Sequence, residues 1–312
     1  MHIAYFEPLG RAWNRMKVAL FKPFDLHKWF VVGFSAFLAG LTEGPRGSGS
    51  SGGRRAGDLS FREFLNLPNK AWDWLVSHPG WFALILFGIG FIIVLVVVLT
   101  WLSSRGTFMF LDNVVYDKAE IAKPWKHFQT EGNSLFLWKV GFGFICLALF
   151  VMFFVFFFTT ASHLYEGISY HRVPVGFIVG MAFLFICMMI IIGYILMFLK
   201  NFVVPIMYKN NITTTRAWGR FLSLFSQHPF HFILYGLLVF GLTILVGIFV
   251  ILAGLLTCLV GFVVLIIPYI GTVATLPIWY TYRAFSLEFL AQFGPEYGLF
   301  PPDKGSVVKA AA

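Results

Sequence analysis

Charged residues are scarce in this sequence. Only 12% of the residues are charged and 59% are hydrophobic, whereas soluble domains average about 25% charged residues. A soluble core cannot bury so large an apolar fraction. The composition therefore excludes an ordinary soluble domain and predicts a protein that meets lipid.

Cysteines and catalytic motifs are also few. The three cysteines, Cys146, Cys187 and Cys258, lie in apolar runs without a CxxC spacing or a histidine partner, which is typical of buried thiols rather than of disulfides or zinc ligands. The sequence contains no G-x-S-x-G, HExxH or Walker motif. We therefore expect no catalytic residue, no metal, no cofactor and no enzymatic activity.

Long uncharged segments indicate how often the chain crosses a membrane. A spanning helix needs about 20 apolar residues. Four uncharged segments exceed that length, and they lie between Asp73 and Arg105, Lys139 and Glu166, Arg172 and Lys200, and Arg220 and Arg283. The last segment can hold two spans. We expect it to turn near 253–258 and to kink at Pro268 and Pro277, where neighbouring helices can satisfy the freed carbonyls.

A shorter apolar run, residues 29–42, is ambiguous between a span and a re-entrant piece. If it spans, most of the 23 lysines and arginines fall on one side, and positive charge normally accumulates on the cytoplasmic side. If it does not span, the charges divide almost evenly. We therefore favour six spans in the cell membrane, with both termini cytoplasmic, and we expect no cleaved signal peptide in the charged first 27 residues.

The remaining segments fit a single integral membrane domain over residues 1–312. Residues 42–59 are rich in Gly and Ser and predict a flexible loop. Residues 60–77 combine a capping-box pattern with two tryptophans, which predicts an interfacial helix. Residues 291–312 are expected to form a C-terminal tail.

A tryptophan pattern recurs three times. Each tryptophan is followed two residues later by a basic residue or a histidine, and then by an apolar span. The three pairs are Trp13 with Arg15, Trp125 with His127, and Trp218 with Arg220. The recurrence predicts an all-α bundle of three helical hairpins, each preceded by a cytoplasmic amphipathic helix. A general preference of Trp and basic residues for inner interfaces is the alternative explanation.

Two groups of residues are candidate functional or packing sites. The predicted membrane-interface anchors are Trp13, Arg15, Trp125, Trp218, Arg216 and Arg220. Gly176 and Gly180 form a GxxxG pair inside a span, which predicts close helix packing, within the chain rather than in a dimer.

The predicted spans carry no ionisable residue near their middles, which weakens the case for an ion-coupled transporter. We expect a non-enzymatic protein that organises lipid or a membrane protein partner and binds no nucleic acid. Its basic cytoplasmic surface would favour anionic lipids, by about 1 kcal/mol for each nearby Lys or Arg. A transporter or channel for a small or apolar solute is the alternative.

Both ends of the chain resemble a family of uncharacterised prokaryotic multi-span membrane proteins. The resemblance rests on AWNRMKVALFKPFDLHKWFVVGFSAFLAGL, from Ala12, and RAFSLEFLAQFGPEYGLFP, from Arg283. More distantly, the repeated layout is similar to the membrane domain of some glycerophosphodiester phosphodiesterases and to Yip1-type proteins. The resemblance implies a polytopic fold and a prokaryotic origin, and it supplies no catalytic residues.

Overall fold

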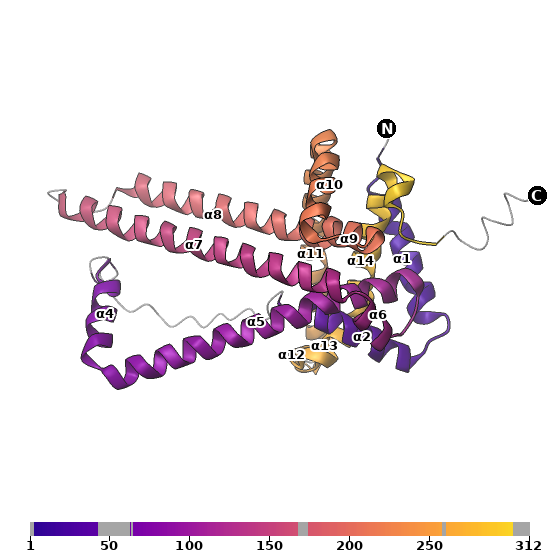
Figure 1. Cartoon of the computed structure of the whole chain (residues 1–312), viewed down its shortest axis with the longest axis horizontal. Coiled ribbons are helices and arrows are strands. Elements are labelled where there is room, and N and C mark those ends of the chain that lie inside the picture. Colours follow the sequence, from indigo (N-terminus) through magenta and orange to yellow (C-terminus); the bar gives the residue numbers. More distant parts are fainter. Residues whose placement is uncertain (1–2, 43–62, 64, 168–173, 258–259, 302–312) are drawn as a thin grey trace, which may run out of the picture. The chain divides into compact units, whose positions relative to one another are not determined.

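The computed structural model describes residues 3–42, 63, 65–167, 174–257 and 260–301, and these residues form helices and no strands. The helices of the first half are α1 (Phe6–Phe21), α2 (Leu26–Gly40), α4 (Leu67–Ser77), α5 (Pro79–Tyr116), α6 (Ala122–His127) and α7 (Gln129–Gly167). Those of the second half are α8 (Val175–Phe198), the π-helical turn η1 (Leu199–Val203), α9 (Val204–Asn210), α10 (Thr214–Gln227), α11 (Pro229–Leu256), α12 (Val260–Ile266), α13 (Pro268–Ala274), α14 (Leu276–Leu290) and the 3₁₀ turns η2 (Ala291–Phe293) and η3 (Pro295–Tyr297) (Figure 1).

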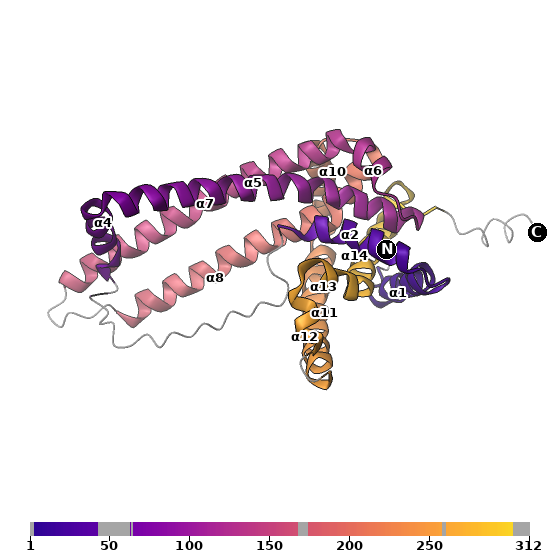
Figure 2. The same ribbon diagram turned by 90° about the horizontal axis from the view of Figure 1, so that it is seen from below.

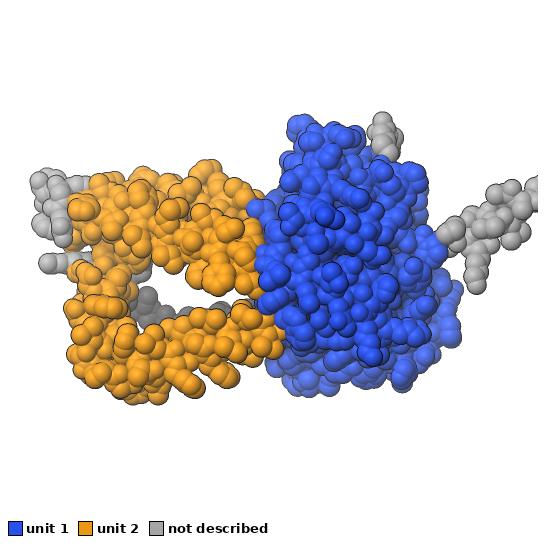
Figure 3. Space-filling view, viewed as in Figure 1, with its two compact units in different colours: residues 1–44, 99–138, 194–312 blue, residues 45–98, 139–193 orange. Residues whose placement is uncertain are grey.

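The chain divides into two compact units (Figure 3). Unit 1 comprises residues 1–44, 99–138 and 194–312, and unit 2 comprises residues 45–98 and 139–193. Unit 2 contains α4 and the most apolar parts of α5, α7 and α8. Within it, phenylalanines of α7 pack against α8, as where the ring centroids of Phe153 and Phe185 lie 5.4 Å apart.

Four helices are long and apolar enough to cross a membrane. They cover Pro79–Tyr116, Gln129–Tyr165, Val175–Asn210 and Pro229–Leu256. None of the residues in the most apolar window of the first two is buried, and only 6% of those in the other two are. Exposed apolar runs of this length are unfavourable in water, so they indicate lipid as the surrounding medium.

Prolines set several helix boundaries. Both α5 and α11 begin at a proline, Pro79 and Pro229, which loses no hydrogen bond in the first helical turn. The expected turn follows α11, which ends at Leu256. The expected kinks are full breaks, because α13 begins at Pro268 and α14 has Pro277 in its first turn.

The first and sixth spans of the predicted arrangement are not found as continuous helices of spanning length. Helix α2 has 15 residues and would extend about 22 Å, less than the roughly 30 Å of a bilayer core. The last apolar segment is divided into α12, α13 and α14, none longer than 15 residues. Four span-length helices are therefore established, and the crossings by these shorter helices remain a prediction.

The predicted connecting segments are only partly described. The Gly/Ser-rich loop at 42–59 and the tail from 302 onward lie outside the described residues, apart from Thr42. Within the segment 60–77, residues 67–77 form α4, with Trp72 and Trp74 exposed, and its location at the membrane interface stays a prediction. Residues 291–301 fold against unit 1, where the rings of Phe293 and Phe232 stack 4.8 Å apart.

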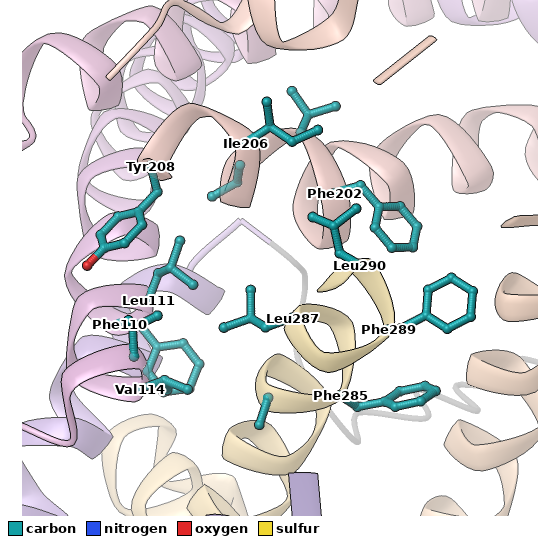
Figure 4. Packing of buried hydrophobic residues seen from close by; sticks show 14 of the residues in the cluster. Phe110, Leu111, Val114, Phe202, Ile206, Tyr208, Phe285, Leu287, Phe289 and Leu290 are labelled. Atoms are coloured by element: carbon teal, nitrogen blue, oxygen red, sulfur yellow. The ribbon is translucent and has the colours of Figure 1, made fainter. Parts of the chain in front are cut away.

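The core of unit 1 is built around α14. Ten of its residues are buried, including every residue from Arg283 to Leu290. Helix α1 packs along it, and α2, η1 and η2 also contact it. In Figure 4, Leu287 points toward Leu111 of α5, whereas Phe285 and Phe289 point to the other side of α14, where both rings pack on Tyr235 of α11.

Two buried polar contacts fix α14 to its neighbours. The Tyr280 hydroxyl donates to the Val114 carbonyl of α5 at 3.2 Å. The Arg283 guanidinium donates to the Lys200 carbonyl in η1 at 2.8 Å. Because unpaired polar groups are costly in an apolar core, these contacts specify the position of the helix.

Small residues allow α2 to lie directly against α5. A Cβ built at Gly106 would lie 2.5 Å from the Leu38 Cβ and 2.8 Å from the Ala39 backbone nitrogen. Close by, the Ser103 hydroxyl donates to the Ala39 carbonyl at 2.9 Å. Helix α2 also packs against α13 (Figure 2). A Cβ built at Gly33 of α2 would lie 2.6 Å from Val273 Cγ2 of α13. This is the small-residue packing that membrane helices use.

We predict that Gly106→Ala destabilises unit 1, because the new methyl group meets the α2 backbone. The clash outweighs the gain in helix propensity, leaving a net loss of about 1–2 kcal/mol in the free energy of unfolding. Gly88→Ala is the matched control on α5, since nothing lies within 4 Å of its Cβ position. Unfolding of both variants in detergent measures the difference, and equal stabilities would contradict the packing.

Candidate membrane-interface site

Helix α1 presents three distinct faces. Its core face, which packs on α14, is formed by the buried residues Pro8, Ala12, Met16, Ala19 and Leu20. A second face carries exposed aromatic residues, and a third carries the polar residues Glu7, Arg11 and Asn14. An ordinary amphipathic helix needs only two faces, so the exposed aromatic face is a feature that packing on α14 does not explain.

We call this second face the α1 stripe and define it as Phe6, Trp13, Lys17 and Phe21. The side chains of its aromatic members are 75%, 47% and 47% exposed, respectively. The Lys17 ammonium lies 5.6 Å from the centre of a Trp13 ring, a cation–π distance. Aromatic rings beside a lysine are typical of the headgroup region of a bilayer. The structure thus leaves the predicted anchor Trp13 on an open surface.

Arg15, a second predicted anchor, is directed to the protein. Its Nε donates to Glu288 Oε1 of α14 at 2.6 Å, and Arg11 Nε lies 3.5 Å from the other oxygen. The Arg15 guanidinium also lies 4.0 Å from the centre of the Phe300 ring. The Glu288 side chain is only 7% exposed and the Arg15 side chain 33%. The role of Arg15 is therefore to neutralise a buried carboxylate.

Trp218 likewise faces the protein. The buried residues of α10 are Thr214, Ala217, Phe221 and Leu224. Trp218 is half-buried beside them, stacked on Trp138 of α7 with ring centroids 5.5 Å apart. The chain itself therefore covers most of the apolar face of this amphipathic helix, although Leu222 is exposed, and Trp218 has a packing role; its role as a membrane anchor stays a prediction.

The opposite face of α10 is open. Arg216 and Arg220 are both exposed on it. These two predicted anchors are therefore free to contact headgroups, although the tryptophan between them points elsewhere. Sequence periodicity correctly separated the two faces, but it could not say that protein rather than lipid covers the apolar one.

Trp125 of α6 belongs to a cluster that the sequence pattern did not indicate. Its ring lies edge-on to Trp101 of α5, with centroids 5.9 Å apart. The Arg105 guanidinium lies 4.6 Å from the centre of the Trp101 ring and 5.2 Å from that of Trp125, and it donates to Asn133 at 3.2 Å. An arginine between two tryptophans is consistent with headgroup depth.

Gly176 and Gly180 are not in a helix–helix contact within the described residues. Both are exposed, and nothing lies within 4 Å of a Cβ built at either position. The close approach predicted there occurs instead in unit 1, at Gly106. The signal for it was the group of small residues Ser103, Ser104, Gly106 and Thr107, which no GxxxG search detects.

Ala4 and Tyr5, which precede α1, contact distant residues of unit 1. The Ala4 amide donates to the Gln292 side chain, which donates back to the Ala4 carbonyl, both at 2.9 Å. The Tyr5 hydroxyl lies 2.6 Å from His231 Nδ1, and burial raises the pKa of this phenol, so it stays protonated and can donate. Among the described residues, no group of three or more His, Cys, Asp or Glu could hold a metal ion.

These features define a helical membrane protein with four span-length helices and an open aromatic face on its first helix. Residues 4–298 match a family described as a family of unknown function (DUF7544), and the chain belongs to that family. No curated protein and no solved structure matches it. The distant similarity to phosphodiesterase membrane domains and Yip1-type proteins thus gains no support from these comparisons.

We predict that alanine substitutions at two of the tryptophans change stability by very different amounts. Trp218→Ala removes a half-buried, stacked ring and should lower the free energy of unfolding by about 2 kcal/mol, less than the 3–5 kcal/mol of a fully buried Trp. Trp13→Ala removes a ring from an open surface and should change it by less than about 0.5 kcal/mol. Unfolding in detergent compares them. If the Trp13 variant is as unstable as the Trp218 variant, the α1 stripe is covered by protein rather than open.

Proposed function

We propose that this protein is a non-enzymatic, multi-span membrane protein that organises lipid, or a membrane partner, at one surface of the bilayer. The observation that carries the proposal is the α1 stripe. It joins exposed aromatic rings to a lysine on a helix whose opposite side is fixed to α14. Such a helix can lie in the headgroup region without unfolding or leaving the protein.

The cations around this helix favour an anionic surface. Lys17 belongs to the stripe, and Lys22 is exposed just after α1. Arg216 and Arg220 add two exposed charges on α10. Each Lys or Arg close to an anionic leaflet contributes about 1 kcal/mol of attraction. We place this surface and both termini on the cytoplasmic side of the cell membrane, as the distribution of positive charge favours.

A transporter or channel is the second candidate, and the broken segment α12–α13–α14 is the observation in its favour, because broken helices bind ligands in transporters. Two observations count against it. The Thr272 and Thr275 hydroxyls near the breaks donate to carbonyls of their own helix, at 2.9 and 2.8 Å. Two hollows in the described residues, one along α7 and one beside α6, are open depressions.

A depth measurement tests the proposed function. We expect a spin label at Trp13→Cys, in a cysteine-free background, to be accessible to oxygen dissolved in lipid. A label at Asn14→Cys, on the polar face of α1, should be accessible to a water-soluble nickel reagent. The full-length protein is reconstituted in vesicles with and without phosphatidylglycerol, and the anionic lipid should deepen position 13.

Positions 13 and 14 serve as controls for each other, because they are neighbours on α1 and their side chains point from different faces of the helix. Equal water accessibility at positions 13 and 14 in both kinds of vesicle would contradict membrane contact by the stripe. If the label at position 13 lies at the same depth with and without anionic lipid, only the proposed attraction to an anionic surface is contradicted.

A further inference from the structure

A surface hollow lies beside α6, the short helix that connects α5 to α7. Its lining residues are Asp112, Lys123, Pro124, Lys126, His127 and Phe128. All belong to unit 1. In this hollow a carboxylate and several cationic or titratable side chains surround one concave surface, a combination that simple packing does not require.

The floor of the hollow is rigid. The Phe128 side chain is buried, with the residue 7% exposed, and its ring packs on Phe108 and Tyr208 with centroid distances of 5.9 and 4.8 Å. The His127 ring stands edge-on to it at 4.6 Å. Side chains locked by such packing hold the polar groups around them in fixed positions.

The segment that leads into α6 is fixed by one buried side chain. Asn113, 1% exposed, accepts from the Glu120 amide through Oδ1 at 3.1 Å. Its backbone carbonyl accepts from the Lys118 amide at 3.2 Å. These bonds hold the backbone of the α5–α6 connection in place, so α6 and its basic residues start from a defined position beside Asp112 of α5.

The charges in the hollow have opposite signs and are not paired with each other. Asp112 accepts from the Tyr208 hydroxyl at 2.6 Å, which holds the carboxylate while leaving acceptor capacity on it. Lys126 and His127 make no ion pair within the described part of the chain. Lys123 reaches Glu120 at 3.3 Å, but its side chain is 82% exposed, so that contact is weak.

We propose that this hollow binds the phosphoethanolamine headgroup of a membrane phospholipid. The primary ammonium would donate to Asp112, and the phosphate would accept from Lys126 and Lys123. A purely anionic headgroup would be repelled by Asp112. A choline group would need an open aromatic cage, and the Phe128 ring is covered. Trp125, in the same short helix, lies beside Trp101, which favours a lipid source over a soluble one.

Binding of single lipids to the full-length protein, measured by native mass spectrometry, tests the assignment. We expect phosphatidylethanolamine to bind about tenfold more tightly than phosphatidylglycerol or phosphatidylcholine, a difference of about 1.4 kcal/mol. Asp112→Asn keeps the side-chain shape and an acceptor for Tyr208, and it should abolish that preference. Lys126→Gln, at an exposed position, should weaken the binding of both phosphatidylethanolamine and phosphatidylglycerol.

Lys70→Gln is the matched control, because it removes one exposed charge from α4, outside the hollow. The control should bind like the native protein. A preference for phosphatidylethanolamine that survives both Asp112→Asn and Lys126→Gln would overturn the proposal, and so would tighter binding of phosphatidylglycerol by the native protein. Displacement by soluble phosphoethanolamine at similar concentrations would contradict the lipid source. The test is independent of the α1 stripe, so its failure leaves the proposed function standing.

Discussion

The ion pair between Arg15 and Glu288 connects the two ends of the chain, and the arrangement of unit 1 depends on it. Glu288 is almost fully buried on α14, and a buried carboxylate without a partner is strongly destabilising. Arg15 and Arg11 supply the compensating charge from α1. Helix α1 must therefore lie along α14 with this face inward, and that orientation is what turns Trp13 and Phe6 outward as a stripe.

This constraint gives unit 1 two different kinds of surface. Toward α14, the chain is packed like a soluble core, with interlocking aromatic rings around Phe289 and Tyr235. Elsewhere, the α1 stripe and the basic residues of α6 and α10 remain open. In unit 2, by contrast, the apolar parts of α5, α7 and α8 are exposed along their length, as expected for helices that contact lipid chains.

The features that were predictable from the sequence are local. Long uncharged runs predicted helices of spanning length, of which the structure contains four, and Pro268 interrupts the last run where a kink was expected. The direction of the side chains was not predictable, because periodicity shows that a helix has an apolar face but not what covers it. Trp13 and Trp218 share one sequence pattern, yet the first is open and the second stacks on Trp138. The pairing of Arg15 with Glu288 links residues 273 positions apart, which no local pattern reports.

A double-mutant cycle between Arg15 and Glu288 tests most directly whether this pair holds α1 to α14. Unfolding in detergent is compared for the native protein, Arg15→Met, Glu288→Gln and the double variant, and the surface pair Glu120 and Lys123, which does not involve Glu288, serves as control. The structure predicts a coupling energy of at least about 1 kcal/mol for Arg15 and Glu288, against about 0.3 kcal/mol for the control pair. A coupling energy no larger than that of the control would contradict the account.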